Sequence, residues 1–372
     1  MHGTSNQNNP KQEEFEMKTS AFSTMCFAAF FAYVPMTASA VSLSKGCGHP
    51  QNLDSGTHTT RIAQPGRTFR IHVPKNYNHN TPTPLITIFH GWGGNENEFI
   101  GDRTVRSEAD KRGYILVAPR GLGSESPDNN YNSWSFSGST TGLDGDSGPI
   151  CDDTITPDYS YESCKTPPTA INTCSWTHCP ANDVEFVVAL VEEIKAELCI
   201  DTDNIFATGG SNGGMFTWEL GQNATSYSTF KAIAPLIGLP HRGYLQPQDE
   251  TVIVMPALVI TGTRDKVVPP GEWDSEINAF TTTSNGNDRY YYTGATPITL
   301  TWALEAGCSM PEAATVFDVG YRKADCRTYC LEDAKEGGWP RVLDCRARMG
   351  HTYNLRWTWK LIMDFFDAHS AP

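Results

Sequence analysis

The chain has 372 residues, of which 39% are hydrophobic and only 19% are charged. This composition supplies enough apolar side chains for a sizeable core, and it carries too little charge for a disordered chain. Asp and Glu outnumber Lys and Arg by 42 to 28, so the net charge of −14 would repel nucleic-acid phosphates and anionic lipid headgroups. We therefore expect a globular protein with no nucleic-acid or membrane partner.

The first forty residues are predicted to lie outside the fold. Lys18 precedes a mostly apolar run at 25–36, and the small residues Ala38-Ser39-Ala40 follow. This order is typical of a secretory signal peptide. The apolar run is well short of the ~20 residues that cross a bilayer, which disfavours a membrane anchor. We expect a signal peptide at 17–40 behind an N-terminal extension at 1–16, and a secreted, extracellular protein.

The remaining residues, 41–372, are predicted to form one catalytic domain in which apolar strands alternate with helices. Strands are expected at 68–73, 85–89, 114–118, 205–208, 232–236, 257–261 and 341–345. Several are almost continuously apolar, which is typical of strands buried on both faces of a parallel sheet. Apolar residues recur at helical spacing in 183–198 and 355–369. This alternation predicts an α/β fold with a mostly parallel central sheet and helices on both faces.

Ten cysteines remain once residues 1–40 are set aside, and an even number in an exported chain predicts disulfides. They are Cys47, Cys151, Cys164, Cys174, Cys179, Cys199, Cys308, Cys326, Cys330 and Cys345. Two of their spacings would also suit half-sites for zinc, but an oxidising compartment disfavours thiolate ligands. We expect five bridges and no metal. Export also makes Asn223, in the sequon Asn223-Ala224-Thr225, a candidate glycosylation site.

Two irregular segments interrupt the alternation of strands and helices. They lie at about 137–181 and 308–345, and each holds four of the ten cysteines. Long loops without secondary structure are often functional, and disulfides favour ordered loops. We therefore interpret both segments as inserts that disulfides hold in place near a functional site.

A candidate nucleophile lies between a strand and a helix. The strand at 205–208 is followed by Gly209-Gly210-Ser211-Asn212-Gly213-Gly214 and then by a helical run at 215–220. This is the G-x-S-x-G pattern in the strand-turn-helix context of a nucleophile elbow, in which small residues allow a sharp turn that exposes the serine hydroxyl. The sequence therefore predicts Ser211 as the nucleophile.

A glycine-rich loop follows the strand at 85–89. It reads His90-Gly91-Trp92-Gly93-Gly94, and its alternative interpretation is a simple tight turn. The oxyanion of a tetrahedral intermediate needs two backbone N–H donors, one from the residue after the nucleophile and one from such a loop. We assign these donors to Asn212 and Trp92, and we expect His90 to order the loop.

The acid and the base should follow the nucleophile in that order. Asp265 comes just after the strand at 257–261, and His351 lies between the last predicted strand and the terminal helix. A solvated aspartate and a surface histidine are the plain alternatives. Asp274 and Asp288 are reserve acids in less defined contexts.

These motifs resemble those of the secreted α/β-hydrolases that include feruloyl esterases, acetylxylan esterases and polyhydroxybutyrate depolymerases. The resemblance covers most of residues 45–369. It rests on Gly46-Cys47-Gly48, Val73-Pro74 with Tyr77, Phe89-His90-Gly91, Ala118-Pro119, Leu198-Cys199-Ile200-Asp201, Ala207-Thr208-Gly209, Ser211-Asn212-Gly213-Gly214-Met215, Gly262-Thr263 with Asp265, Gly307-Cys308 and Gly350-His351. It implies the α/β-hydrolase fold, a triad of Ser211, Asp265 and His351, and an oxyanion hole at Trp92 and Asn212.

The resemblance also implies particular disulfides. It suggests that Cys308 pairs with Cys326 and that Cys47 pairs with Cys199. Proximity in the sequence then pairs Cys330 with Cys345 and leaves two bridges among the four cysteines of the first insert. The number of bridges is better founded than their pairing, because spacing alone does not decide connectivity.

Together, the residues and the resemblance predict a secreted serine carboxylic-ester hydrolase without a cofactor. The specific prediction is a feruloyl esterase acting on feruloylated polysaccharide or oligosaccharide of plant cell walls through an acyl-enzyme. A polyhydroxybutyrate or polyester depolymerase and an acetylxylan esterase are alternatives, and a catalytically silent secreted binding protein is a remote one. Four aromatic residues are candidates to stack on the acyl group or a sugar, with ordinary packing as the alternative. They are Tyr131, Trp134, Trp339 and Tyr353.

Overall fold

The structure is a computed structural model, and it describes most of the chain after the predicted signal peptide. The described residues are 42–49, 53–61, 67–123, 131–157, 159, 161–165, 172–245, 252–276, 278–284, 286–309, 313–334 and 338–371. The predicted extension at 1–16 and signal peptide at 17–40 lie outside them. In the ranges described, no helix is long and apolar enough to cross a membrane.

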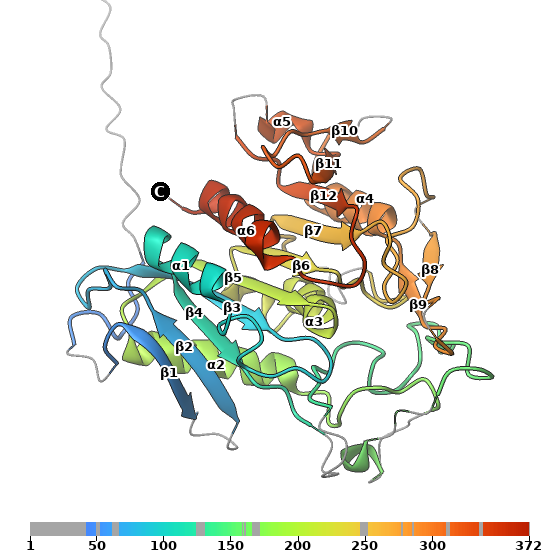
Figure 1. The fold of residues 1–372 in the computed structure, drawn as a ribbon, viewed down its shortest axis with the longest axis horizontal. Coiled ribbons are helices and arrows are strands. Elements are labelled where there is room, and N and C mark those ends of the chain that lie inside the picture. The colour runs from blue at the N-terminus through green and yellow to red at the C-terminus, as the bar shows by residue number, and fades with distance from the viewer. Residues whose placement is uncertain are drawn as a thin grey trace, which may run out of the picture. The chain divides into compact units, whose positions relative to one another are not determined.

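A large sheet organises the described residues (Figure 1). Its ten strands follow the order β1-β2-β4-β3-β5-β6-β7-β12-β11-β10. They are β1 (Gly56–Arg61), β2 (Thr68–Val73), β3 (Thr83–Phe89), β4 (Ile115–Pro119), β5 (Ile200–Gly210), β6 (Ala232–Leu236), β7 (Ala257–Gly262), β10 (Thr315–Val316), β11 (Ala324–Thr328) and β12 (Val342–Ala347). The strands from β4 to β12 in this order run parallel, whereas the outer pairings at both edges are antiparallel.

Helices cover both faces of this sheet (Figure 1). They are α1 (Arg103–Arg112), α2 (Asp183–Glu197), α3 (Asn212–Gln222), α4 (Ala295–Glu305), the short α5 (Leu331–Ala334) and α6 (Leu355–His369). Side chains of a strand alternate between the faces, so Leu85 and Phe89 of β3 belong to the core cluster that includes residues of α2, α3 and α4, while Ile86 and Ile88 belong to the cluster that includes residues of α1 and α6. A separate ribbon of β8 (Phe280–Thr282) and β9 (Tyr291–Thr293) lies outside the large sheet.

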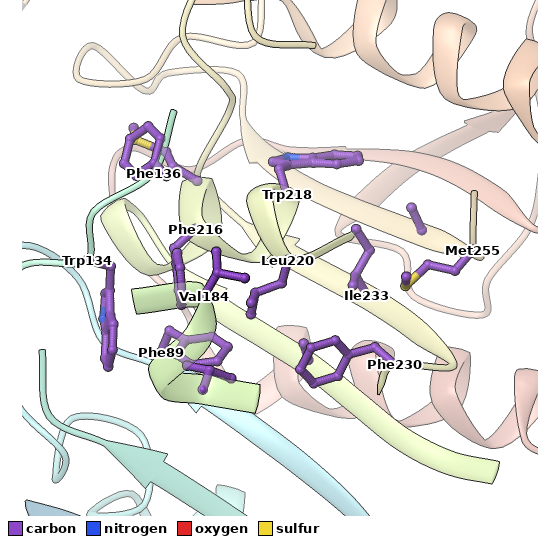
Figure 2. Close-up of a cluster of buried hydrophobic side chains, with 14 of the residues drawn as sticks. Phe89, Trp134, Phe136, Val184, Phe216, Trp218, Leu220, Phe230, Ile233 and Met255 are labelled. Atoms are coloured by element: carbon purple, nitrogen blue, oxygen red, sulfur yellow. The ribbon is translucent and has the colours of Figure 1, made fainter. Parts of the chain in front are cut away.

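The core under α3 is built from large aromatic side chains (Figure 2). Phe89, Trp134 and Phe216 lie with ring centroids 5.0–5.3 Å apart, and Trp134 stacks on Phe216. All three are fully buried. Because Phe216 belongs to α3 and Phe89 ends β3, this cluster fixes the helix that follows Ser211 against the strand that precedes the glycine-rich loop.

Five disulfides join all ten cysteines outside the predicted signal peptide, as the sequence predicts. They are Cys47–Cys199, Cys151–Cys174, Cys164–Cys179, Cys308–Cys330 and Cys326–Cys345. The predicted pairing of Cys47 with Cys199 is present, but Cys308–Cys326 and Cys330–Cys345 are wrong. Cys326 and Cys345 face each other in the antiparallel register of β11 and β12, with their Cα atoms 4.0 Å apart. Cys330, just beyond β11, therefore pairs with Cys308.

Candidate active site

Four loops that carry the candidate catalytic residues leave the same edge of the sheet. Trp92 follows β3, Ser211 follows β5, Asp265 follows β7 and His351 follows β12. These four strands all belong to the parallel part of the sheet, so their carboxyl ends point the same way. Ligand sites of open α/β sheets form at this edge. Residues far apart in the sequence are thereby brought together.

Ser211 occupies a sharp turn between β5 and α3. Its φ of 55° and ψ of −118° are unusual for a residue with a side chain and store backbone strain at this position. A Cβ at Gly209 would lie 2.5 Å from the carbonyl oxygen of Gly213, and one at Gly213 would lie 2.2 Å from that of Phe89. Only glycine fits these two positions, which explains the G-x-S-x-G spacing.

Ser211, His351 and Asp265 form a chain of hydrogen bonds. Nε2 of His351 lies 2.8 Å from Oγ of Ser211, and Nδ1 lies 2.7 Å from Oδ2 of Asp265. Asp265 is only 4% exposed, and its Oδ1 accepts N–H groups of Val267 and Val268 at 2.8 and 2.9 Å. Because a carboxylate only accepts hydrogen bonds, Nδ1 carries the imidazole proton and Nε2 is available to accept the serine proton.

Asn212 directly follows Ser211 in the chain and is held in place by the core. It is the first residue of α3, so its N–H group has no acceptor within the helix. Its side chain accepts the N–H of Trp134 at 2.7 Å and donates to the carbonyl of Trp134 at 3.0 Å. This two-way contact fixes Asn212, which is completely buried, against the aromatic core.

The glycine-rich loop lies directly beside Ser211. A Cβ added to Gly91 would lie 3.6 Å from Cβ of Ser211. The loop is held by the N–H of Gly91, which donates to Glu98 at 2.9 Å, and by the N–H of Gly93, which donates to the carbonyl of Asn132 at 2.8 Å. These contacts leave the N–H of Trp92, between the two glycines, as the loop's candidate oxyanion donor.

His90 orders the loop from within the core, as the sequence predicts. Its Nδ1 lies 2.7 Å from the carbonyl oxygen of Gly91, and its Nε2 accepts the N–H of Gly121 at 2.9 Å. Burial lowers the pKa of His90 to about 4. The ring is therefore neutral near pH 7 and can accept the hydrogen bond from Gly121.

A cavity of about 240 Å³ opens beside Ser211 and His351. Five of its lining residues are tryptophan or tyrosine and three are Met or Val, and Thr283 and Asp288 are the polar lining residues besides Ser211 and His351. The lining consists of Trp92, Tyr159, Trp176, Ser211, Met215, Val267, Val268, Thr283, Asp288, Tyr290, Tyr292 and His351. A cavity of about 150 Å³ holds benzene, so this one has room for an aromatic ring with a short extension.

The chain is similar to known esterases in sequence and in fold, although no protein-family model matches it. It is 25% identical over 289 residues to the "Probable feruloyl esterase C" of Aspergillus flavus, and the aligned residues cover 76% of this chain and 84% of that protein. It is 28% identical over 182 residues to feruloyl esterase D of Neurospora crassa, about half of each chain. An acetyl xylan esterase from Aspergillus awamori aligns with a TM-score of 0.51 at 13% identity, over 84% of this chain and 99% of that one.

The chain is a carboxylic ester hydrolase with the α/β-hydrolase fold. The fold class predicted from the sequence is thereby confirmed, as is the resemblance to the feruloyl and acetylxylan esterase group.

None of the four aromatic residues proposed as substrate contacts lines the cavity of the esterase. Tyr131 stacks on Trp92, with ring centroids 4.2 Å apart, and is not among the residues that line the cavity. Trp134 is a core residue, and Trp339 packs on Phe317 and Phe365 among residues that cover the other face of the sheet. For Trp134 and Trp339, ordinary packing therefore describes the structure better than a substrate contact does.

Tyr353 packs against the glycine-rich loop of the esterase. Its ring stacks on Phe99 at a centroid distance of 4.9 Å, and its hydroxyl would contact a Cβ added to Gly91. Burial, and next the negative charge of Glu98, raise the pKa of Tyr353 well above its ordinary value. The phenol therefore stays protonated near pH 7, and Tyr353 does not line the cavity.

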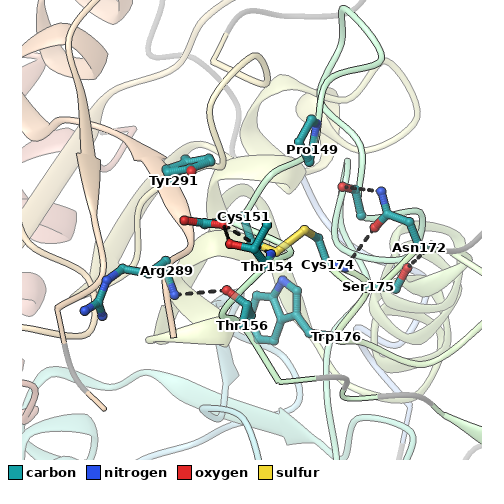
Figure 3. The surroundings of a disulfide bond; sticks show 12 residues. Pro149, Cys151, Thr154, Thr156, Asn172, Cys174, Ser175, Trp176, Arg289 and Tyr291 are labelled. Atoms are coloured by element: carbon teal, nitrogen blue, oxygen red, sulfur yellow. Dashed lines mark hydrogen bonds between the residues drawn. A yellow bond between two sulfur atoms is a disulfide. The ribbon is translucent and has the colours of Figure 1, made fainter. Parts of the chain in front are cut away.

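The cavity walls that sequence reasoning missed come from two segments that pair with each other. The segment around Cys151 forms an antiparallel bridge with Tyr290, and the N–H of Tyr291 donates to the carbonyl of Ile150 at 2.8 Å. Figure 3 shows this region: the Cys151–Cys174 disulfide lies beside Thr156, whose hydroxyl accepts the N–H of Arg289 at 3.1 Å. The pairing places Tyr290 and Tyr292 beside Trp176 in one wall.

Trp176 is itself fixed by a buried histidine. Its Nε1 donates to Nε2 of His241 at 2.9 Å, and burial lowers the pKa of His241 to about 4. A neutral His241 can accept this bond near pH 7. The only sequence signal for Trp176 is its place between Cys174 and Cys179, within the insert that was expected to lie near the site.

The two reserve acids are placed differently. Asp274 is exposed in the loop that follows β7, whereas Asp288 lines the cavity and accepts a hydrogen bond from Tyr159. Asp265 is the carboxylate that meets the imidazole of His351.

Proposed function

We propose that the esterase is a secreted feruloyl esterase that cleaves hydroxycinnamoyl esters of plant cell-wall polysaccharides through an acyl-enzyme on Ser211. The observation that carries the proposal is the pair of hydrogen bonds from Ser211 through His351 to Asp265, next to a cavity with aromatic walls. The names of the relatives in Aspergillus flavus and Neurospora crassa support the substrate class.

In this mechanism, Nε2 of His351 takes the proton of Ser211 as Oγ attacks the ester carbonyl. Asp265 holds the imidazole in the required tautomer and stabilises its positive charge. The backbone N–H groups of Trp92 and Asn212 donate to the carbonyl oxygen as it becomes negative. His351 then protonates the leaving alcohol, and a water molecule repeats the sequence on the acyl-enzyme to release the acid.

The cavity favours an aromatic acyl group over an acetyl group. At about 240 Å³ it would stay largely empty beside a bound acetyl ester, whereas a phenylpropenoyl group would contact Trp92, Trp176 and Tyr290. Aromatic side chains gain from offset-stacked and edge-to-face contacts with such a ring. Acetylated xylan and hydroxybutyrate oligomers are therefore expected to be poorer substrates.

Secretion and domain organisation belong to the same proposal. We infer that a signal peptide at 17–40 precedes a single catalytic domain at 41–372. The five disulfides support this, since such bonds persist in oxidising compartments. Glycosylation of Asn223 stays a prediction; its side chain is half-buried and donates to Glu219 at 3.1 Å.

The test is the Ser211→Ala variant assayed with methyl ferulate. Loss of the nucleophile is expected to lower kcat by on the order of a millionfold, to abolish labelling by a serine-directed phosphonate and to leave the melting temperature close to that of the wild type. Ser228→Ala, at an exposed serine outside the cavity, is the matched control and should keep full activity. More than a few per cent of residual activity in Ser211→Ala would contradict the assignment.

A substrate panel separates the alternatives. The wild type should prefer methyl ferulate to acetylated xylan, hydroxybutyrate oligomers and short-chain nitrophenyl esters in kcat/KM. A preference for acetylated xylan or for the oligomers would replace the proposed substrate. A folded protein that hydrolyses none of the four would contradict the proposed substrate class and favour the alternative of a catalytically silent binding protein.

A further inference from the structure

Among the described residues that line the cavity beside Ser211, one acidic side chain is not used by the proposed mechanism. Asp288 precedes β9 and lines the same cavity as Ser211, among aromatic and apolar residues. A carboxylate on such a wall raises the free energy of the folded state unless hydrogen-bond donors replace the water molecules that it loses. The donors that reach Asp288 therefore indicate what the wall is suited to bind.

Tyr159 of the insert supplies one donor. Its hydroxyl lies 3.0 Å from Oδ1 and 3.3 Å from Oδ2 of Asp288. Burial, and next the negative charge of Asp288, raise the pKa of Tyr159 to about 12, so the phenol remains a donor near pH 7. A carboxylate can accept about four hydrogen bonds, which leaves Asp288 with further capacity to accept.

The ring of Tyr159 also shapes the space next to this carboxylate. It meets Trp92 edge to face, with centroids 5.3 Å apart, and Trp92 borders the cavity near Ser211. An aromatic acyl group that enters between these walls therefore meets Ser211 and Asp288 in a single cavity. Its ester would lie at the hydroxyl of Ser211, and a donor on its ring could reach the carboxylate.

We propose that Asp288, oriented by Tyr159, recognises the free phenolic hydroxyl of a 4-hydroxycinnamoyl group. This inference rests on the proposed function and adds a selection among aromatic acyl groups. A phenol donates its O–H to the carboxylate of Asp288. An acyl group whose 4-oxygen is methylated has no proton to donate, and its methyl group would instead face a carboxylate that has lost water.

The first test compares two esters on the wild-type protein. Methyl ferulate has a free 4-hydroxyl, and methyl 3,4-dimethoxycinnamate differs by one methyl group on that oxygen. A hydrogen bond to a charged group corresponds to a preference of roughly 10- to 100-fold in kcat/KM for methyl ferulate. The difference should lie mainly in KM, since the contact is distant from the bonds that change.

The second test uses variants of the acidic residue. Asp288→Ala should reduce the preference to about threefold or less by raising KM for methyl ferulate, and Asp288→Asn should reduce it partly because the amide oxygen still accepts a weaker bond. Tyr159→Phe should weaken the preference less than Asp288→Ala, since the carboxylate remains. Asp274→Ala, at the exposed acid outside the cavity, is the matched control and should keep the wild-type ratio.

The outcomes separate this inference from the proposed function. Equal kcat/KM values for the two esters in the wild type, or an unchanged ratio in folded Asp288→Ala, would overturn the inference and leave the proposed function intact. Hydrolysis of 4-nitrophenyl acetate without hydrolysis of either cinnamate ester would overturn both. If Asp288→Ala does not fold, the wild-type ratio and the Asp288→Asn variant still decide the question.

Discussion

The insert at 137–181 and the edge segment at 308–345 contain the same number of cysteines but have different structures. The two disulfides of the insert span 23 and 15 residues, and those of the edge segment span 22 and 19. No described residue of the insert belongs to a strand of the large sheet, but its Tyr159 and Trp176 line the cavity. The edge segment forms β10, β11, α5 and β12, and none of its described residues lines the cavity.

This difference shows that disulfide density does not by itself mark a binding site. In the edge segment, Cys326–Cys345 joins two strands that the sheet already pairs. In the insert, Cys151–Cys174 joins two stretches of irregular chain, one of which carries Trp176. The bonds of the insert therefore order a surface that backbone pairing alone would not hold.

A buried carboxylate adds to this anchoring of the insert. Oδ2 of Asp183 accepts the N–H and the hydroxyl of Ser135 at 2.7 and 3.0 Å and lies 3.1 Å from Nε2 of His178, while Oδ1 accepts from Arg67. Ser135 just precedes the insert and His178 lies near its end. Both ends of the insert thus converge on the first residue of α2.

The largest expected effect on stability comes from replacing the carboxylate of Asp183. Asp183→Asn should lower the free energy of unfolding by about 3–5 kcal/mol, because it leaves the buried cation of Arg67 without its counter-ion. The matched control in the edge segment is Asp325→Asn, whose ion pair with the partly exposed Arg327 should contribute less than about 1 kcal/mol. Urea denaturation at pH 7 measures both values. Equal losses in the two variants would contradict the proposed difference in anchoring.

The same residue predicts a pH dependence of stability. Burial alone would raise the pKa of Asp183, but His178, Arg67 and the N–H of Ser135 together hold it below its ordinary value. A lowered pKa contributes stability that is present above the unfolded value of about 4 and is lost as the pH falls through the folded value. Below pH ~4, the wild type should therefore lose unfolding free energy more steeply than Asp183→Asn. Parallel curves from pH 7 to pH 3 would rule out this contribution.

The next prediction compares the loss of one disulfide from each region. Closing loops of these lengths stabilises a fold by about 3 kcal/mol in the chain-entropy treatment, so Cys151→Ala/Cys174→Ala and Cys326→Ala/Cys345→Ala should lose similar stability. On folded protein, only the first pair of substitutions should lower kcat/KM for methyl ferulate, by roughly 10- to 100-fold, because the wall at Trp176 becomes misplaced. Equal activity losses would show that the edge segment also shapes the cavity.

The smallest expected effect is a change in KM, and it distinguishes two tryptophans. Trp176→Leu should raise KM for methyl ferulate about 2- to 10-fold, the range that an aromatic pair contributes. Trp339→Leu removes a ring that packs on Phe317 and Phe365, so it should lower the melting temperature and leave KM within about twofold. Steady-state kinetics on both variants checks this. A raised KM in Trp339→Leu alone would favour the substrate contact suggested by the sequence.

The centre of the fold could be predicted from the sequence because its signals are local. Every predicted strand lies in the large sheet, since a strand buried on both faces, such as β6 or β7, reads as an apolar run. The edges lack this signal: both residues of β10 are exposed, and β11 is only partly buried. The error in pairing Cys326 follows directly, because without β11 its register against β12 could not be inferred.

The candidate triad could be predicted for a related reason. Asp265 and His351 each follow a recognisable parallel strand, so chain order and sheet geometry are enough to bring them to Ser211. The cavity walls could not be predicted in this way. Tyr290 and Trp176 meet because the segment around Cys151 pairs with β9 and its neighbours, and no local pattern encodes contacts between such distant segments.

The disulfide Cys47–Cys199 has a consequence for biosynthesis. It spans 152 residues, whereas each of the other four bridges spans at most 23. During synthesis from the N-terminus, the four cysteines of the insert emerge before Cys199 does. Cys47 thus meets four non-native partners first, and exchange of mispaired disulfides takes seconds to hours. We therefore expect the yield of correctly oxidised protein to depend on a disulfide isomerase in the producing cell.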